Sequence, residues 1–196
     1  GEDEEHLPYA ENSFDAVISL LTLQWVNDVP GALAQIRRVL KPDGLFFAII
    51  PGGESLRELR DVLAQTEAAL YGGISPRVSP FVDVRDGGAL LQRAGFALPV
   101  ADSETLSISY ANLFALMDDL RKSGQSNALS DRTSRPTTRA FFVQAAAAYA
   151  AQHADGEGRI PATVEFVTLT GWKPAENQQK PAPRGSGKIS LSQVLK

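Results

Sequence analysis

The feature that most constrains this chain is a strand, helix, strand pattern between residues 7 and 51. Ala16-Val17-Ile18 has the length and β-branched content of a buried parallel strand, and residues 45–50 form a second continuous apolar run. Between them, Asp28 precedes apolar side chains at three- and four-residue spacing, which predicts a capped amphipathic helix ending at residues 41–44. Such a unit implies a right-handed crossover between parallel strands. The sequence therefore predicts an α/β fold.

The remaining residues predict further helices and two more strands. Apolar residues recur at helical spacing in four segments: 54–70, 86–94, 111–122 and 137–152. Asp86 is the expected N-cap of the helix predicted at residues 86–94. Residues 104–110 alternate apolar and polar side chains as a half-exposed strand does, and 163–172 form a final strand. The polar segment 123–136 and the residues after Pro174 are expected to be flexible.

Composition excludes several classes of function. The 196 residues are 43% hydrophobic, which is enough for one domain with a core. A net charge of -4 gives no basic patch for nucleic acid. The chain has no cysteine and only His6 and His153 as imidazoles, so we predict neither a disulfide framework nor a metal site. No apolar run has the length of a membrane span, so a soluble chain without a transmembrane segment is expected.

Several short motifs, taken in order, resemble the class I S-adenosylmethionine-dependent methyltransferase family. They are LPYAENSFDAVI, LQWVND and RVLKPDG followed by an apolar strand. Later motifs are similar to one subgroup, the complex I assembly factors described as methyltransferase-like arginine hydroxylases, and their bacterial relatives. These motifs are GGISPRVSPF, LLQRAGF, IPATVEF with GWKP, and PRGSGKISLSQVL. The malonyl-acyl-carrier-protein methyltransferases of biotin synthesis are also related, although the later motifs fit the assembly-factor branch better.

The resemblance implies a Rossmann-like mixed sheet whose last strand runs antiparallel to its neighbours. The family's first strand and glycine-rich turn are not found in these residues. We therefore expect residues 1–174 to be the C-terminal portion of a methyltransferase-like domain, with a helical insertion at 111–152 and an extended tail at 175–196. We also expect S-adenosylmethionine, the cofactor of the intact protein, to bind this chain weakly or not at all.

The family's cofactor positions fall on four residues. Asp3 matches the acidic side chain that accepts the adenine amino group, and the amide of Glu4 matches the donor to the ring. The alternative is that both belong to a solvated acidic segment. Ser19 and Leu20 lie at a strand end, which in this family faces the methionine part of the cofactor. Ordinary packing at the end of a strand is the alternative for this pair.

Three residues are candidates for contacts with the substrate. Gln24 and Trp25 lie where family members begin to line the substrate pocket, with core packing as the alternative for Trp25. Arg77 lies between prolines, where a fixed guanidinium binds a carboxylate or carbonyl, unless it is a solvated surface residue. Methyl transfer requires mainly positioning, so no catalytic residue is identified.

Three functions from different classes remain open. The first is methyl transfer to a small molecule or carrier-bound acid. The second is modification of an arginine in a respiratory complex subunit by an assembly factor, whose oxygen chemistry would need a cofactor that these residues do not reveal. The third is a non-catalytic binding module. The expected location is the cytoplasm for a bacterial protein and the mitochondrial matrix for a eukaryotic one.

Overall fold

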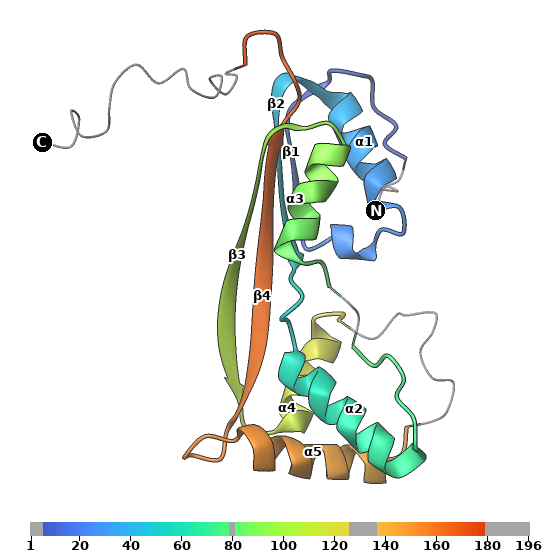
Figure 1. Ribbon diagram of the computed structural model, residues 1–196, viewed down its shortest axis with the longest axis vertical. Helices are drawn as coiled ribbons and strands as arrows, with labels where there is room; N and C mark the ends of the chain where they lie inside the picture. Colours follow the sequence, from blue (N-terminus) through green and yellow to red (C-terminus); the bar gives the residue numbers. More distant parts are fainter. Residues whose placement is uncertain (1–5, 79–80, 126–136, 179–196) are drawn as a thin grey trace, which may run out of the picture.

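A single mixed sheet organises the computed structural model, which describes residues 6–78, 81–125 and 137–178 (Figure 1). The sheet has four strands in the order β1-β2-β4-β3. The strands are β1 (Phe14–Leu20), β2 (Leu40–Pro51), β3 (Ala97–Tyr110) and β4 (Ile160–Trp172). β1 and β2 are parallel, and β4 runs antiparallel to both β2 and β3. The predicted mixed sheet and its antiparallel last strand are confirmed.

The predicted crossover unit connects β1 to β2 through α1 (Val29–Val39). The carboxylate of Asp28 caps α1 by accepting a hydrogen bond from the amide of Gly31 at 2.9 Å. The prediction that β1 is buried was wrong, since Ile18 is 63% exposed and Leu20 is 56% exposed. β1 lies at an edge of the described sheet with only β2 beside it, so an apolar strand there does not become covered on both faces.

One apolar core lies between the sheet and two helices, α1 and α3 (Val84–Arg93), which cover the same face (Figure 1). Alternate residues of β2 enter this core, and the ring of Phe46 packs at 5.2 Å from that of Phe96. A Cβ on Gly87 would lie 2.8 Å from Cδ2 of Leu169, so glycine allows α3 to approach β4 closely. The predicted cap of α3 was wrong by three residues, because Asp83 accepts the amide hydrogen bond at 2.8 Å.

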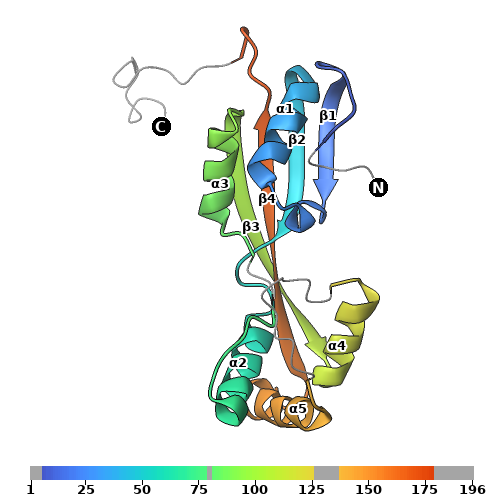
Figure 2. The same ribbon diagram turned by 90° about the vertical axis from the view of Figure 1, so that its right-hand side faces the viewer.

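A second apolar core lies at the other end of the molecule. It is formed by α2 (Arg57–Tyr71), α4 (Leu113–Lys122) and α5 (Arg139–His153), packed near the far ends of β3 and β4 (Figure 2). Phe141 and Tyr149 of α5 are completely buried in it. The long strands β3 and β4 extend along both cores, whereas β2 ends at Pro51 where the chain passes from one to the other.

Element types agree with the sequence prediction, and most differences concern boundaries. β3 begins seven residues earlier than residue 104, because it pairs with β4 from Ala97 onward through a register shift before Val100. Most of the segment 123–136 and the tail from 179 lie outside the described residues, so their expected flexibility is not tested. The proposed division at residue 174 stays a prediction.

Candidate functional site

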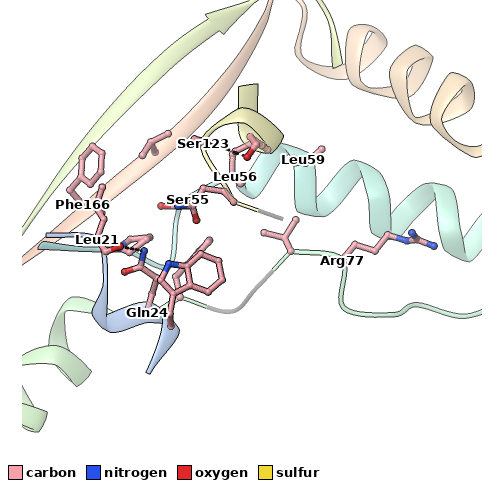
Figure 3. Close-up of a pocket in the computed structure, with 15 residues that line it drawn as sticks. Leu21, Gln24, Ser55, Leu56, Leu59, Arg77, Ser123 and Phe166 are labelled. Carbon is pink, nitrogen blue, oxygen red and sulfur yellow. Dashed lines mark hydrogen bonds between the residues drawn. The ribbon is translucent and has the colours of Figure 1, made fainter. Parts of the chain in front are cut away.

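A pocket of about 320 Å³ opens between the two cores, beyond the carboxyl ends of β1 and β2 (Figure 3). This volume is within the range of small-molecule sites. Carboxyl ends of parallel strands are also where α/β sheets bind ligands. The lining is predominantly apolar and comes from the turns after β1 and β2, the loop after α2, the end of α4, and β4: Leu21, Gln24, Trp25, Pro51, Ser55, Leu56, Leu59, Arg77, Val78, Phe81, Leu120, Ser123, Gln125, Val164 and Phe166.

Two leucines in the pocket wall have left-handed backbone conformations. Leu21, immediately after β1, has φ of 55°, and Leu56, immediately before α2, has φ of 56°. Such conformations are unfavourable for leucine by about 1–3 kcal/mol and persist only where neighbouring contacts fix them. The amide of Leu21 donates to the carbonyl of Ile49 at 2.9 Å, and that of Leu56 donates to Thr163 at 2.7 Å. Both turns are therefore held in the shape that forms the wall.

The turn after β1 places the first two substrate candidates in the pocket wall. Gln24 and Trp25 belong to the short 3-10 helix η1 (Leu23–Trp25), in which Leu23 is the residue buried in the core. Trp25 is 45% exposed, so its indole lies at the pocket and is not a core side chain. Nε2 of Gln24 donates to the carbonyl of Leu21 at 2.7 Å.

The third candidate, Arg77, lines the same pocket but uses its guanidinium elsewhere. Nε and Nη2 donate to the carboxylate of Glu67 at 3.0 and 2.9 Å, and Nη1 donates to Thr137 at 3.0 Å. Its Cζ also lies 4.4 Å from the ring centroid of Phe141. Figure 3 shows the guanidinium turned away from the other lining side chains. Arg77 thus fixes the loop to α2 and α5, and its predicted contact with a substrate stays a prediction.

The contacts with Arg77 and Ser75 change the pKa of the Glu67 carboxyl. Burial raises the pKa of Glu67, but hydrogen bonds from Arg77 and Ser75 outweigh it and lower the pKa to about 2. The side chains of Glu67 and Arg77 are only 7% and 13% exposed. A charged pair of this kind is stabilising only while it remains complete, since loss of one partner leaves a buried charge.

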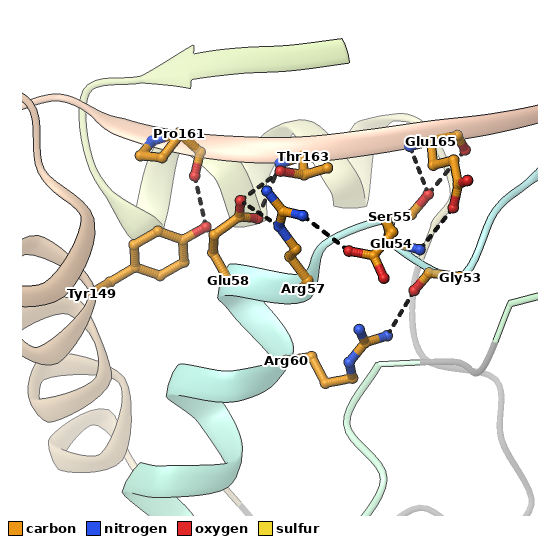
Figure 4. A network of polar contacts seen from close by, with 10 residues as sticks. All are labelled: Gly53, Glu54, Ser55, Arg57, Glu58, Arg60, Tyr149, Pro161, Thr163 and Glu165. Carbon is orange, nitrogen blue, oxygen red and sulfur yellow. Dashed lines mark hydrogen bonds and ion pairs between the residues drawn. The ribbon is translucent and has the colours of Figure 1, made fainter. Parts of the chain in front are cut away.

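The turn after β2 is attached to β4 by a set of hydrogen bonds (Figure 4). Ser55 Oγ donates to the carbonyl of Glu165 and accepts from its amide, both at 3.0 Å. The carboxylate of Glu165 accepts from the amide of Glu54 at 2.8 Å. A Cβ on Gly52 would lie 2.4 Å from this carboxylate, so the close approach requires glycine. These contacts fix Ser55 and Leu56 beside β4.

A buried polar group continues this attachment into the second core. The carboxylate of Glu58 accepts hydrogen bonds from the hydroxyl and the amide of Thr163, the latter at 3.1 Å. Burial raises the pKa of Glu58, but the bonds from Thr163 and Arg57 prevail and lower it. Tyr149 donates from its hydroxyl to the carbonyl of Pro161 at 2.8 Å, and burial raises the pKa of its phenol. The start of α2 is thus held against β4 (Figure 4).

Two of the four expected cofactor residues, Ser19 and Leu20, lie beside the pocket and do not line it. Ser19 Oγ shares a 2.7 Å hydrogen bond with Thr22 Oγ1, and Leu20 is exposed at the carboxyl end of β1. Asp3 and Glu4 lie outside the described residues. The structure therefore brings Gln24, Trp25 and Arg77 together, and places Ser19 and Leu20 at the adjoining strand end.

Sequence reasoning missed most of the wall, including Ser55, Leu56 and Phe166. Ser55 follows a glycine pair directly after a predicted strand, which is a signal for a close approach of the backbone. Leucine has no preference for a left-handed conformation, so nothing at Leu56 indicates its role.

Among the described residues, no group of three or more His, Cys, Asp or Glu side chains is placed to hold a metal ion. No described helix has the length and apolar character needed to cross a membrane.

Comparisons with known proteins agree with this architecture. A family model described as "Methyltransferase domain" matches residues 1–48. The chain is 44% identical over 194 residues to the mouse protein "Arginine-hydroxylase NDUFAF5, mitochondrial", covering 99% of this chain and 56% of that protein. It is 38% identical over 178 residues to a malonyl-[acyl-carrier protein] O-methyltransferase of Laribacter hongkongensis, covering 91% and 57%. The chain thus spans little more than half the length of these curated relatives.

Solved structures show the same fold at low sequence identity. The YcgJ protein of Bacillus subtilis superposes with a TM-score of 0.54 at 17% identity, covering 88% of this chain and 69% of that chain. A protein of Bacillus halodurans that is proposed to be a methyltransferase gives a TM-score of 0.52 at 15% identity, covering 89% and 76%. These likenesses concern the fold alone.

Proposed function

We propose that the pocket between the two cores receives the group that the protein modifies, since the chain belongs to the class I S-adenosylmethionine-dependent methyltransferase family. The observation that carries this proposal is the convergence of Gln24, Trp25 and Arg77 on one cavity just beyond the carboxyl ends of β1 and β2. The largely apolar lining excludes water, and its fixed turns position a bound group.

The cofactor would be held at the adjoining end of β1. This strand end fits such a ligand, because Leu20 is exposed and the hydroxyl of Ser19 makes only an exposed contact with Thr22. Asp3 and Glu4 are the proposed contacts to the adenine ring. S-adenosylmethionine would supply an activated methyl group, and the residues of this chain would orient it toward the pocket.

Titration of the ¹⁵N-labelled chain with S-adenosylmethionine, followed by NMR, tests this placement. We expect the amide signals of Ser19 and Leu20 to shift progressively at millimolar cofactor, as weak binding predicts. The internal control is the amide of Ser109, near the end of β3 that packs against the second core, and its signal should not shift. Shifts confined to other elements would contradict the proposed cofactor site.

A second candidate function is modification of an arginine in a respiratory complex subunit. It is favoured by the 44% identity over 99% of this chain to a protein named as an arginine hydroxylase, against 38% over 91% to a named methyltransferase. Mass spectrometry of arginine-containing substrate proteins separates the two, because methylation adds a methylene group and hydroxylation adds an oxygen atom. Retention of a partner without either mass change would instead support a binding module. A mitochondrial location is proposed for a eukaryotic protein and a cytoplasmic one for a bacterial protein.

A further inference from the structure

The amide oxygen of Gln24 is a buried hydrogen-bond acceptor without a partner among the described residues. The orientation of the amide follows from its other end, since Nε2 donates to the carbonyl of Leu21 at 2.7 Å. A flipped amide would place two oxygens against each other, so Oε1 must point away from that carbonyl. A buried acceptor normally has a hydrogen bond, and an exception requires an explanation.

The position of Gln24 suggests what completes this acceptor. Gln24 lines the main pocket and also a smaller cavity of about 120 Å³ beside it, so it lies in the wall that the two cavities share. Its oxygen is buried by protein atoms. A ligand donor therefore reaches the oxygen only when a neighbouring side chain of the wall moves aside. Trp25, the next residue, is 45% exposed and lines the same pocket.

The two hydroxyl groups and the guanidinium of the wall are already bonded to other parts of the protein, whereas the side chain of Gln125 is exposed. The hydroxyl of Ser55 is bonded to the backbone of Glu165, and the guanidinium of Arg77 is bonded to Glu67. The hydroxyl of Ser123 donates to the carbonyl of Asp119 at 2.9 Å. A ligand anion would therefore find no free cation among the described residues of the wall, and would meet the oxygen of Gln24.

A ligand cation is equally disfavoured. No Asp or Glu is present among the described residues that line the pocket, so an ammonium or guanidinium group would be buried without a counter-charge. Among the described residues, the wall thus combines apolar surface with one buried neutral acceptor that lacks a partner, Oε1 of Gln24. Both observations select against charge in the part of the ligand that enters the pocket.

We infer that the pocket binds a neutral, mainly apolar group carrying an N–H or O–H that donates to Oε1 of Gln24. This inference rests on the proposed function, in that it specifies the chemistry of the group that enters the proposed substrate pocket. Gln24 is then a specificity-determining residue: the apolar wall binds the body of the group, and the amide oxygen selects its donor. An amide-linked acyl chain has this chemistry, whereas a free arginine side chain does not.

Four short probes with the same apolar chain test the inference: hexanamide, N,N-dimethylhexanamide, hexanoate and hexylamine. Binding is followed by the fluorescence of Trp25, with Trp25→Phe to identify its signal against that of Trp172. We expect hexanamide to bind about tenfold more tightly than its dimethyl analogue, which lacks the N–H, because one hydrogen bond to a buried acceptor has that effect. Hexanoate and hexylamine should bind more weakly than hexanamide.

Two variants assign the preference to Gln24. Gln24→Leu should bind hexanamide and the dimethyl analogue equally, and Gln24→Glu should shift the preference toward hexylamine. Circular dichroism verifies that each variant folds, and either variant alone suffices. Failure of hexanamide to bind, or an amide preference that survives both substitutions, overturns the inference. The probes are tested without cofactor, so this failure is distinguishable from failure of the proposed function, which the S-adenosylmethionine titration measures.

Discussion

Replacing Glu67 by glutamine should destabilise the protein in a way that depends on pH. The pKa of Glu67 falls from the ordinary 4.5 to about 2 on folding, because the bonds from Arg77 and Ser75 outweigh the effect of burial. A carboxyl with this difference contributes about 3 kcal/mol to the free energy of unfolding at neutral pH. Since the folded-state pKa is lowered, the contribution is complete above the unfolded value and is lost as the pH falls from 4.5 toward 2.

Urea denaturation of the wild type and Glu67→Gln measures this contribution. At neutral pH the variant should be less stable by about 3 kcal/mol, and at about pH 3 the difference should shrink to roughly 1 kcal/mol. Asp118→Asn is the matched control, because Asp118 forms an ion pair with Lys122 at 2.7 Å on the exposed face of α4. Its effect should be much smaller, as for surface pairs in general. A difference between wild type and Glu67→Gln that stays constant from neutral pH to pH 3 would refute the reasoning.

Four further substitutions test the two cores and the turn after β2. In urea denaturation, Gly52→Ala should be less stable than Gly53→Ala by roughly 1–2 kcal/mol, because its Cβ would displace the carboxylate of Glu165. Nothing lies within 4 Å of a Cβ at Gly53, so Gly53→Ala is the control. Equal free energies of unfolding for the two variants would contradict this. Tyr149→Phe should cost about 1–2 kcal/mol by leaving a β4 carbonyl unpaired, and an unchanged thermal midpoint would show that the bond is unimportant. Phe46→Ala should cost about 3–5 kcal/mol in urea denaturation, and a loss below 1 kcal/mol would mean that the core around it collapses.

The fold was largely predictable, because the spacing of apolar residues along the sequence distinguishes helices from strands. The apolar run of β1 and the spacing in α1 are local properties of the sequence, and both elements are where they were expected. The burial of β1 was not predictable in this way, because a run of apolar residues looks the same whether or not neighbours cover it. Its exposure depends on which elements lie beside it, which is a tertiary property.

The candidate site was predictable only in part. Gln24 and Trp25 were identified through their place after β1, and the structure puts both in the pocket wall. Arg77 was identified as well, but its ion pair with Glu67 joins residues ten positions apart across a turn, and local spacing does not reveal this partner. The contribution of Phe166 was missed, because it depends on the pairing of β4 with the end of β2.

The extension of β4 along both apolar cores has a consequence for how the protein unfolds. One end of the strand contributes Val167 and Leu169 to the first core, and the other contributes Ile160 and Ala162 to the second. Separation of either core from the sheet would therefore expose apolar residues of the same strand and interrupt its hydrogen bonds to β3. The two ends of the molecule should consequently lose structure in a single cooperative transition, with the same free energy of opening for hydrogen exchange of the β4 amides near both cores.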